Sequence, residues 1–164
     1  MTMNGRIFWG FLLVLCFGSA MNLPGQRAFD RSAFYAAMAS SKLEVVDDQL
    51  AVIKGMTGVE KEAYEGALLM KKSGLVTKAK EKLSLFKSGR AKLENSIARD
   101  KDNTEFRFLR LIIQEHAPKI VNYRDELEKD SKQIKTNFKS LPEIVQQAIM
   151  DYSKKSTVLK AISL

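Results

Sequence analysis

The stretch LENSIARDKDNTEFRFLRL, residues 93–111, contains the pattern that decides the fold class of this 164-residue chain. Apolar residues recur at helical spacing in its first part, the polar run DKDN interrupts them, and a second apolar pattern follows. The stretch therefore predicts the end of one helix, a turn, and a second helix that begins at Thr104. The face of this second helix that we expect to point inward carries Phe106, Leu109 and Ile113, with Phe108 and Ile112 beside them.

Helical signatures also dominate the rest of the chain. Alternating β-branched runs with Asn-Gly or Asp-Gly turns are missing from the sequence, and it contains only three prolines. We therefore expect an all-α fold of about six to seven helices, in a single domain over residues 32–164. The helices are expected over residues 33–39, 43–53, 59–72, 78–99 and 104–116, then along a stripe from 123 to 141, and after Pro142.

Residues 1–20 have the layout of a secretory signal peptide, with a short basic segment, the apolar run IFWGFLLVLCF and small residues before a cut near Ala20. A membrane-spanning helix needs about 20 apolar residues, so we expect cleavage, export to the periplasm or the medium, and no stable membrane insertion afterwards. An uncleaved anchor is the alternative. Cys16 would be removed with the peptide, and residues 21–31 would form a flexible mature N-terminus.

The chain is basic, with 27 Lys and Arg against 19 Asp and Glu. This excess favours anionic partners, and it is also a common way to keep a protein soluble. The lysine clusters at 71–72, 78–82 and 154–155 are short and lie at expected helix ends. A solvated surface explains them, and weak contact with an anionic envelope surface is the alternative.

Part of the opening stretch resembles the junction between two tetratricopeptide repeats. The residues that match the repeat pattern in order are Leu93, Ser96, Ile97, Asp100, Asp102 and Asn103. Lys101 stands where the repeat has proline, and Gly66 and Gly89 lie 23 residues apart, where the repeat needs about 12. The resemblance implies tetratricopeptide-like antiparallel hairpins without a regular array. Gly89 lies on the inward stripe of its helix, which predicts close approach of another helix backbone.

A second resemblance covers most of the chain after the expected cleavage site. The blocks EKEAYEGALLMKKSGLV (60–76), KEKLSLFKSGRAKLENSI (80–97) and EFRFLRLIIQEHAPKIVNYRDELEKD (105–130) resemble exported helical proteins of Bacteroidetes bacteria that have no assigned activity. The resemblance implies an exported, all-helical, tetratricopeptide-like protein. It implies no reaction.

The residues offer no recognisable catalytic, cofactor or metal motif. After cleavage the chain would contain no cysteine and one histidine, His116, at an expected helix end where the helix dipole favours a cation. A Gly-x-Ser-x-Gly elbow, a zinc-protease helix and a phosphate-binding glycine loop are all missing. A cell-envelope hydrolase with a carboxylate pair is the alternative, because it needs only two acids across a cleft. The candidates for such a pair are Glu60, Glu62, Glu65, Glu105 and Glu115.

Two arginines in the opening stretch have two interpretations. Arg107 and Arg110 lie beside the inward face of their helix, and they could pair with acidic side chains or line a groove. The acidic partners that we considered are Glu94, Asp100 and Glu105. Nucleic acid is not an expected partner, because the neighbouring aromatics share their face with aliphatic residues.

The sequence therefore predicts an exported, non-catalytic helical binding or scaffold protein with a protein or peptide partner. The polar residues that we expect to face its groove are Arg107, Arg110, Gln114 and Tyr123. No cofactor or metal is expected, and the sequence leaves the oligomeric state open.

Overall fold

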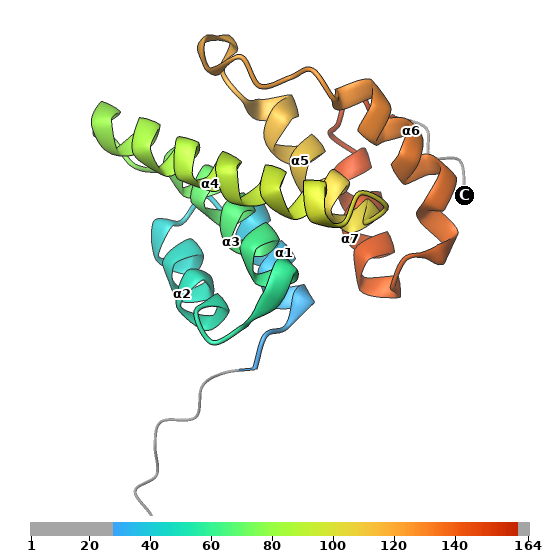
Figure 1. Ribbon diagram of the computed structural model, residues 1–164, viewed down its shortest axis with the longest axis horizontal. Coiled ribbons are helices and arrows are strands. Elements are labelled where there is room, and N and C mark those ends of the chain that lie inside the picture. Colours follow the sequence, from blue (N-terminus) through green and yellow to red (C-terminus); the bar gives the residue numbers. More distant parts are fainter. Residues whose placement is uncertain (1–27, 161–164) are drawn as a thin grey trace, which may run out of the picture.

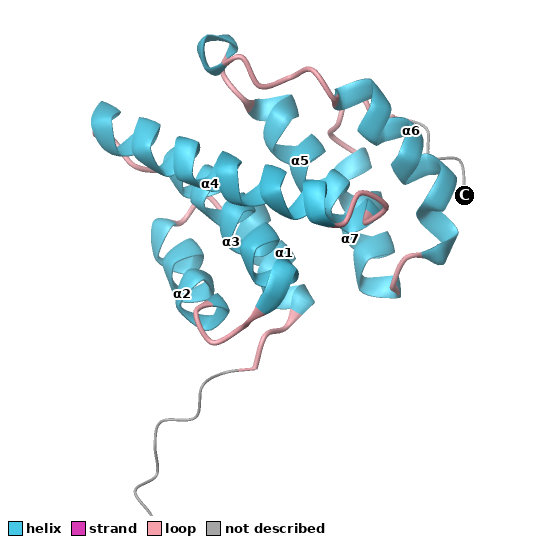
Figure 2. Ribbon diagram, in the orientation of Figure 1, coloured by secondary structure: helices cyan, strands magenta, loops and turns pink. Residues whose placement is uncertain are grey.

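The computed structural model describes residues 28–160, and within this range the chain is helical and contains no strand (Figures 1 and 2). The α-helices are α1 (Arg31–Ala39), α2 (Leu43–Ile53), α3 (Gly58–Ser73), α4 (Ala79–Arg99), α5 (Thr104–His116), α6 (Leu127–Asn137) and α7 (Glu143–Ser153). Two short 3-10 helices, η1 (Lys119–Val121) and η2 (Phe138–Ser140), join the last three. The predicted all-α class is confirmed.

Helix α5 is the central element of the fold, because ten of its 13 residues are buried and it contacts α3, α4 and α6. Phe106, Leu109 and Ile113 pack into a core with helices α1 to α4. Phe108 and Leu111 pack into a second core with α6 and α7. A helix that is apolar all round is a buried helix, and the run FRFLRLII comes close to this character apart from Arg107 and Arg110. The predicted inward aromatics are confirmed as core.

Helices α3 and α4 form an antiparallel hairpin in which two glycines meet. A Cβ atom on Gly66 would lie 2.7 Å from the Gly89 carbonyl oxygen, and one on Gly89 would lie 2.6 Å from the Gly66 carbonyl oxygen. Near one end of the hairpin, Ser96 Oγ donates a hydrogen bond to the Val59 carbonyl. The predicted close approach at Gly89 is confirmed. A stack of further tetratricopeptide-like hairpins is not confirmed, since α5 pairs chiefly with α6.

The first described residues belong to the packed domain. Asp30 accepts hydrogen bonds from the backbone amides of Ser32 and Ala33 and so caps α1, which begins at Arg31. The ring of Phe29 stacks on Tyr64 with centroids 4.7 Å apart. Residues 29–31, which we expected in a flexible terminus, are thus held by a cap and by aromatic packing. The expected signal peptide lies outside the described residues.

The long helix expected along residues 123–141 is shorter in the structure. After Pro118, the chain forms η1 and turns at Asn122, whose φ is +43°, so regular helix resumes only at Leu127. Asparagine tolerates this left-handed conformation better than most residues. Helix α6 then ends at Asn137, and Pro142 precedes α7 as predicted. Of the helices within residues 28–160, none is both long and apolar enough to span a membrane.

Candidate functional site

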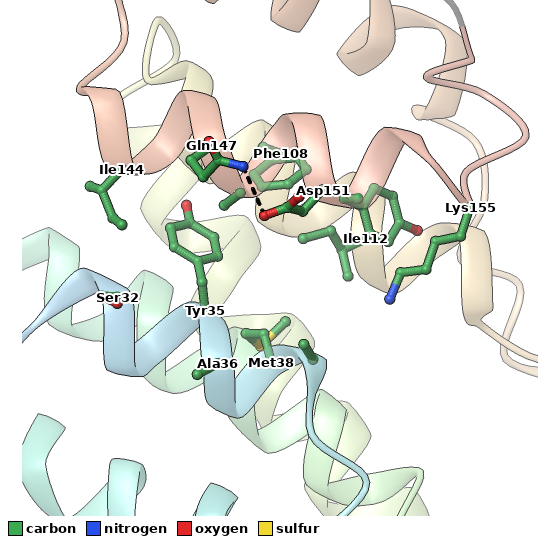
Figure 3. A pocket seen from close by; sticks show the side chains of 13 residues that line it. Ser32, Tyr35, Ala36, Met38, Phe108, Ile112, Ile144, Gln147, Asp151 and Lys155 are labelled. Carbon is green, nitrogen blue, oxygen red and sulfur yellow. Dashed lines mark hydrogen bonds between the residues drawn. The ribbon is translucent and has the colours of Figure 1, made fainter.

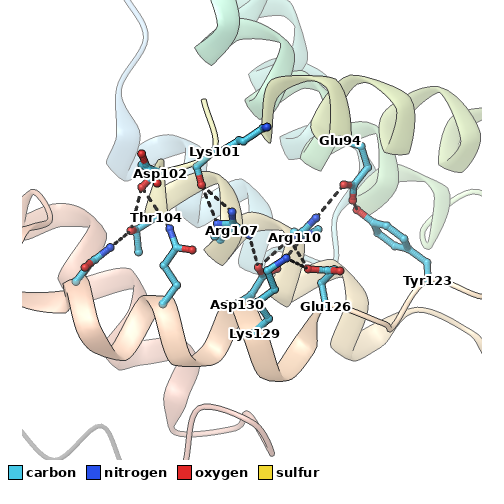
Figure 4. Close-up of polar contacts among 12 residues, drawn as sticks. Glu94, Lys101, Asp102, Thr104, Arg107, Arg110, Tyr123, Glu126, Lys129 and Asp130 are labelled. Carbon is cyan, nitrogen blue, oxygen red and sulfur yellow. Dashed lines mark hydrogen bonds and ion pairs between the residues drawn. The ribbon is translucent and has the colours of Figure 1, made fainter. Parts of the chain in front are cut away.

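A buried cluster of charged residues joins α5 to α6 (Figure 4). Asp130 is fully buried, and its two carboxylate oxygens accept hydrogen bonds from Arg110 Nε at 2.7 Å and Nη2 at 2.8 Å. Arg107 Nη1 donates to the same carboxylate at 3.2 Å, and its Nη2 donates to the Lys101 carbonyl at 2.7 Å. One carboxylate therefore holds both arginines of α5, and Arg107 also closes the turn before that helix.

Arg110 reaches a second group of acids at the edge of the cluster. Its Nη1 donates to Glu94 at 2.9 Å, and its Nη2 lies 3.4 Å from Glu126. Burial by itself lowers the pKa of Arg110, but hydrogen bonds and the charges of Asp130 and Glu94 outweigh burial and raise it. The Tyr123 hydroxyl also donates to Glu94, and burial together with that carboxylate raises the pKa of Tyr123.

The four residues predicted to face a groove lie inside the protein. Arg107, Arg110, Gln114 and Tyr123 are 8%, 5%, 1% and 3% exposed. Their placement does not agree with an open groove, and for Arg107 and Arg110 it agrees with the alternative, structural pairing. The physical reason is that α6 covers the face of α5 that carries the arginines.

The acidic partners of these arginines were predicted only in part. Glu94 is confirmed. Asp100 and Glu105 are wrong: Asp100 accepts a hydrogen bond from Asn103, and Glu105 accepts one from Tyr35 at 2.9 Å. We did not predict Asp130 as a partner, although its position in the sequence indicated one. It lies between Leu127 and Ile134 on the stripe that we expected to be apolar, where a carboxylate requires a buried partner.

An apolar cleft of about 700 Å³ lies between two walls of the domain. One wall comes from the end of α3 and the beginning of α4, and the other comes from the end of α5 and from η1, while the end of α1 and the chain around the end of α7 complete the lining. Its most buried apolar lining residues are Met38, Met70, Phe86, Ile113 and Ala117. Leu83 and Ile120 also line the cleft and are 48% and 93% exposed. This volume is typical of sites that bind small molecules.

The lysine and histidine side chains of the lining are its only basic groups, and the lining contains no acidic group. They are Lys71, Lys82, Lys155 and His116, and no aspartate or glutamate is among the lining residues. Within residues 28–160, no carboxylate lies within ion-pair distance of the three lysines, whereas their sequence neighbours Lys72 and Lys154 pair with Asp47 and Asp151. The three lysines of the cleft thus have no acidic partner within the described chain, in contrast to these two neighbours.

The charge of Lys155 reaches Lys71, which lines the same cleft. Burial and the positive charge of Lys155 lower the pKa of Lys71. Lys155 lies with its Nζ 5.5 Å from the centre of the Tyr152 ring, a cation–π contact that orients the side chain. Two like charges at one apolar surface favour a ligand that brings negative charge between them.

A smaller hollow of about 300 Å³ adjoins the cleft, between α1 and α7 (Figure 3). The two hollows share a wall made of Met38, Ala39, Ile112, Tyr152 and Lys155. Tyr35 and Asp151 line the smaller hollow but not the larger one. Lys155 therefore lies where the hollows meet, and the smaller one has an acidic side chain that the cleft lacks.

The five glutamates considered for a hydrolase are engaged in other contacts. Glu60, Glu62, Glu65 and Glu105 lie within ion-pair distance of Arg31, Arg99, Lys92 and Arg31, respectively. Glu115 accepts hydrogen bonds from the segment after α7. In neither hollow described above do two carboxylates face one another, and the described residues contain no cluster of metal-ligating side chains. The carboxylate-pair alternative thus gains no support from this part of the chain.

Glu115 ties the segment after α7 to the central helix. Its carboxylate accepts hydrogen bonds from the hydroxyls of Ser156 at 2.7 Å, Thr157 at 2.7 Å and Tyr152 at 2.9 Å, and from the Thr157 amide. Burial raises the pKa of Glu115, but these hydrogen bonds outweigh burial and lower it to about 2. Leu159, which follows, is fully buried in the second core.

Replacing Glu115 by glutamine is expected to give a pH-dependent loss of stability. The folded pKa lies below the usual value of 4.5, so the carboxylate stabilises the fold above pH 4.5 and loses this effect as the pH falls toward 2. Solvent screening of this partly exposed group limits the contribution to about 1 kcal/mol. Urea unfolding of both proteins between neutral and acidic pH measures it. A difference that stays constant over this range would contradict the prediction.

Comparisons of this chain with protein-family models, with curated proteins and with solved structures found no match. The class of protein is therefore defined by the fold and the cleft. It is an all-helical domain around a buried central helix, with an apolar cleft whose charged lining side chains are basic.

Proposed function

We propose that this protein is an exported, non-catalytic binding protein and that the cleft beside α5 is its binding site. The observation that carries the proposal is an apolar cleft of about 700 Å³ whose lining includes three lysines, one histidine and no carboxylate. Such a surface favours a ligand or partner segment with an apolar body and a negative charge. The proposed binding residues are therefore Lys71, Lys82 and Lys155, in place of the buried arginines of α5.

Export is a proposal that rests on the beginning of the chain. The apolar run followed by small residues and a cut near Ala20 supports it, as does the resemblance to exported helical proteins of Bacteroidetes bacteria. The lysines that we expected to be solvated, or to touch an anionic envelope surface, supply the charge of the cleft. The protein or peptide partner expected from the sequence is one class of occupant that this cleft could take.

Binding of an apolar anion should depend on the lysines that line the cleft. We expect anilinonaphthalene sulfonate, a fluorescent apolar anion, to bind the native protein with one molecule per chain. Lys71→Gln and Lys155→Gln should each weaken this binding about tenfold, because each removes a positive charge from the lining of an apolar cleft. A fluorescence titration measures the dissociation constants.

The neighbouring lysines provide matched controls. Lys72→Gln and Lys154→Gln remove the same charge one residue away, where the lysine pairs with a carboxylate, and should leave dye binding nearly unchanged. Ala79→Trp should block the site, because Ala79 lines the cleft at the beginning of α4. Circular dichroism and a melting curve confirm that each variant is folded. Equal losses from Lys71→Gln and Lys72→Gln, or full binding by the tryptophan variant, would refute the proposed site.

A further inference from the structure

The side chains that line the cleft offer almost no free hydrogen-bonding group apart from the cations. Besides the basic residues, its polar side chains are Ser73 and Tyr152. Ser73 Oγ already donates to the Met70 carbonyl at 2.6 Å, and the Tyr152 hydroxyl donates to Glu115. An extended peptide in this cleft would find few side-chain partners for its backbone amides and carbonyls, and each group left unpaired costs free energy. A hydrocarbon chain has no such groups.

The size of the cleft limits how a helical peptide could bind. A helix that binds in a groove uses anchors from i to i+7 on one face, and two turns with side chains fill on the order of 1,000 Å³. The cleft holds about 700 Å³, so it could take one face of such a helix but could not enclose two turns. A single hydrocarbon chain could enter and contact the buried floor at Met70, Phe86 and Ile113. Methionine side chains at Met38 and Met70 adapt to a chain of variable shape.

The positive charges of the lining favour a ligand with a negative group at one end. Lys71 and Lys155 line the same cleft, and no carboxylate of the described chain pairs with either. The cation–π contact with the Tyr152 ring places the ammonium group of Lys155 at the cleft wall. A negative head group beside both lysines would relieve their mutual repulsion and form charge-assisted hydrogen bonds.

We propose that the cleft binds a long-chain fatty acid, with the hydrocarbon chain between the α3–α4 wall and α5 and the carboxylate beside Lys71 and Lys155. This rests on the proposed function, because it assigns a ligand class to the same site. Leu83 and Ile120, the exposed apolar residues of the lining, would cover the part of the chain nearest the solvent.

Calorimetric titration of the full chain with fatty acids below their micellar concentration tests the assignment. We expect hexadecanoate to bind with one molecule per chain, and the affinity to fall roughly tenfold for every two methylenes removed, through dodecanoate to octanoate. The double variant Lys71→Gln/Lys155→Gln should weaken hexadecanoate binding at least tenfold while leaving methyl hexadecanoate unchanged. The double variant Lys72→Gln/Lys154→Gln is the matched control. Because all variants share residues 1–27, differences between them report on the cleft.

Each remaining outcome decides against the assignment. Equal binding of hexadecanoate and its methyl ester would show that the lysines do not hold a carboxylate. Tighter binding of hexadecyl phosphate would assign the head group to a phosphate instead. Displacement of the bound dye by an acidic amphipathic peptide but not by hexadecanoate would assign the cleft to a protein partner. If the dye binds in the cleft and no fatty acid does, the fatty-acid assignment fails while the proposed binding site stands; if neither binds, both fail.

Discussion

Replacing Asp130 by asparagine is expected to lower the free energy of unfolding by about 3–5 kcal/mol, because it removes the only carboxylate that contacts both Arg107 and Arg110 in the described chain. Asparagine has nearly the same shape, so the loss comes from charge and not from a cavity. The two guanidinium groups would remain buried beside a neutral amide, whose NH2 group is a donor and cannot replace the second carboxylate oxygen as an acceptor. Since a domain is stabilised by only about 5–15 kcal/mol in total, this is a large change. Urea unfolding measures it.

Two further variants test whether the loss of stability comes from the unpaired buried arginines. Glu128→Gln removes an acid from the exposed side of α6 and should change the stability by less than about 0.5 kcal/mol. Replacing Asp130 by leucine together with methionine at Arg107 and Arg110 should cost less than Asp130→Asn alone, because no buried charge is left without a partner. Wild-type stability of Asp130→Asn would show that the cluster is hydrated and does not join α5 to α6.

Replacing Gly89 by alanine is expected to cost about 3 kcal/mol, although alanine favours helix over glycine by about 1 kcal/mol. The new Cβ would lie 2.6 Å from the Gly66 carbonyl oxygen and 2.9 Å from the Met70 amide nitrogen. Both atoms belong to the backbone of α3, so no rotamer change can relieve the contact. The two helices would have to separate along the most extensive interface of the fold. The midpoint of thermal or urea unfolding checks this prediction.

Gly74 provides the matched control for this substitution. A Cβ there would meet only the Lys71 carbonyl oxygen, at 3.4 Å, and the backbone φ of −73° suits any residue. Gly74→Ala should therefore leave the stability nearly unchanged. A Gly89→Ala protein as stable as the wild type would mean that α3 and α4 do not cross as closely as the structure shows.

The groove expected along α5 and the buried cluster found there differ for a physical reason that particular residues illustrate. Arg107, Arg110 and Gln114 were expected on a stripe beside the inward face of their helix, where the arginines could pair with acidic side chains or line a groove. Helix α5 is instead covered on that side by α6, which brings Asp130 to both arginines from 20 and 23 residues away. The lysines of the cleft could not be separated from their neighbours by sequence, since Lys71 and Lys72 are adjacent and only one faces the cleft.

The sequence by itself determined the local structure of this protein. Helical spacing, the DKDN turn, Pro118 and Pro142 define where helices begin and end, because these signals act through backbone geometry and hydrogen bonds within a few residues. The position of Gly89 on a buried stripe also predicted where another helix backbone comes close. Only the tertiary structure decided which side chains meet across the chain. It buried the arginines of the opening stretch and left Lys71 and Lys155 together at an apolar cleft, because burial and charge pairing depend on which elements cover one another.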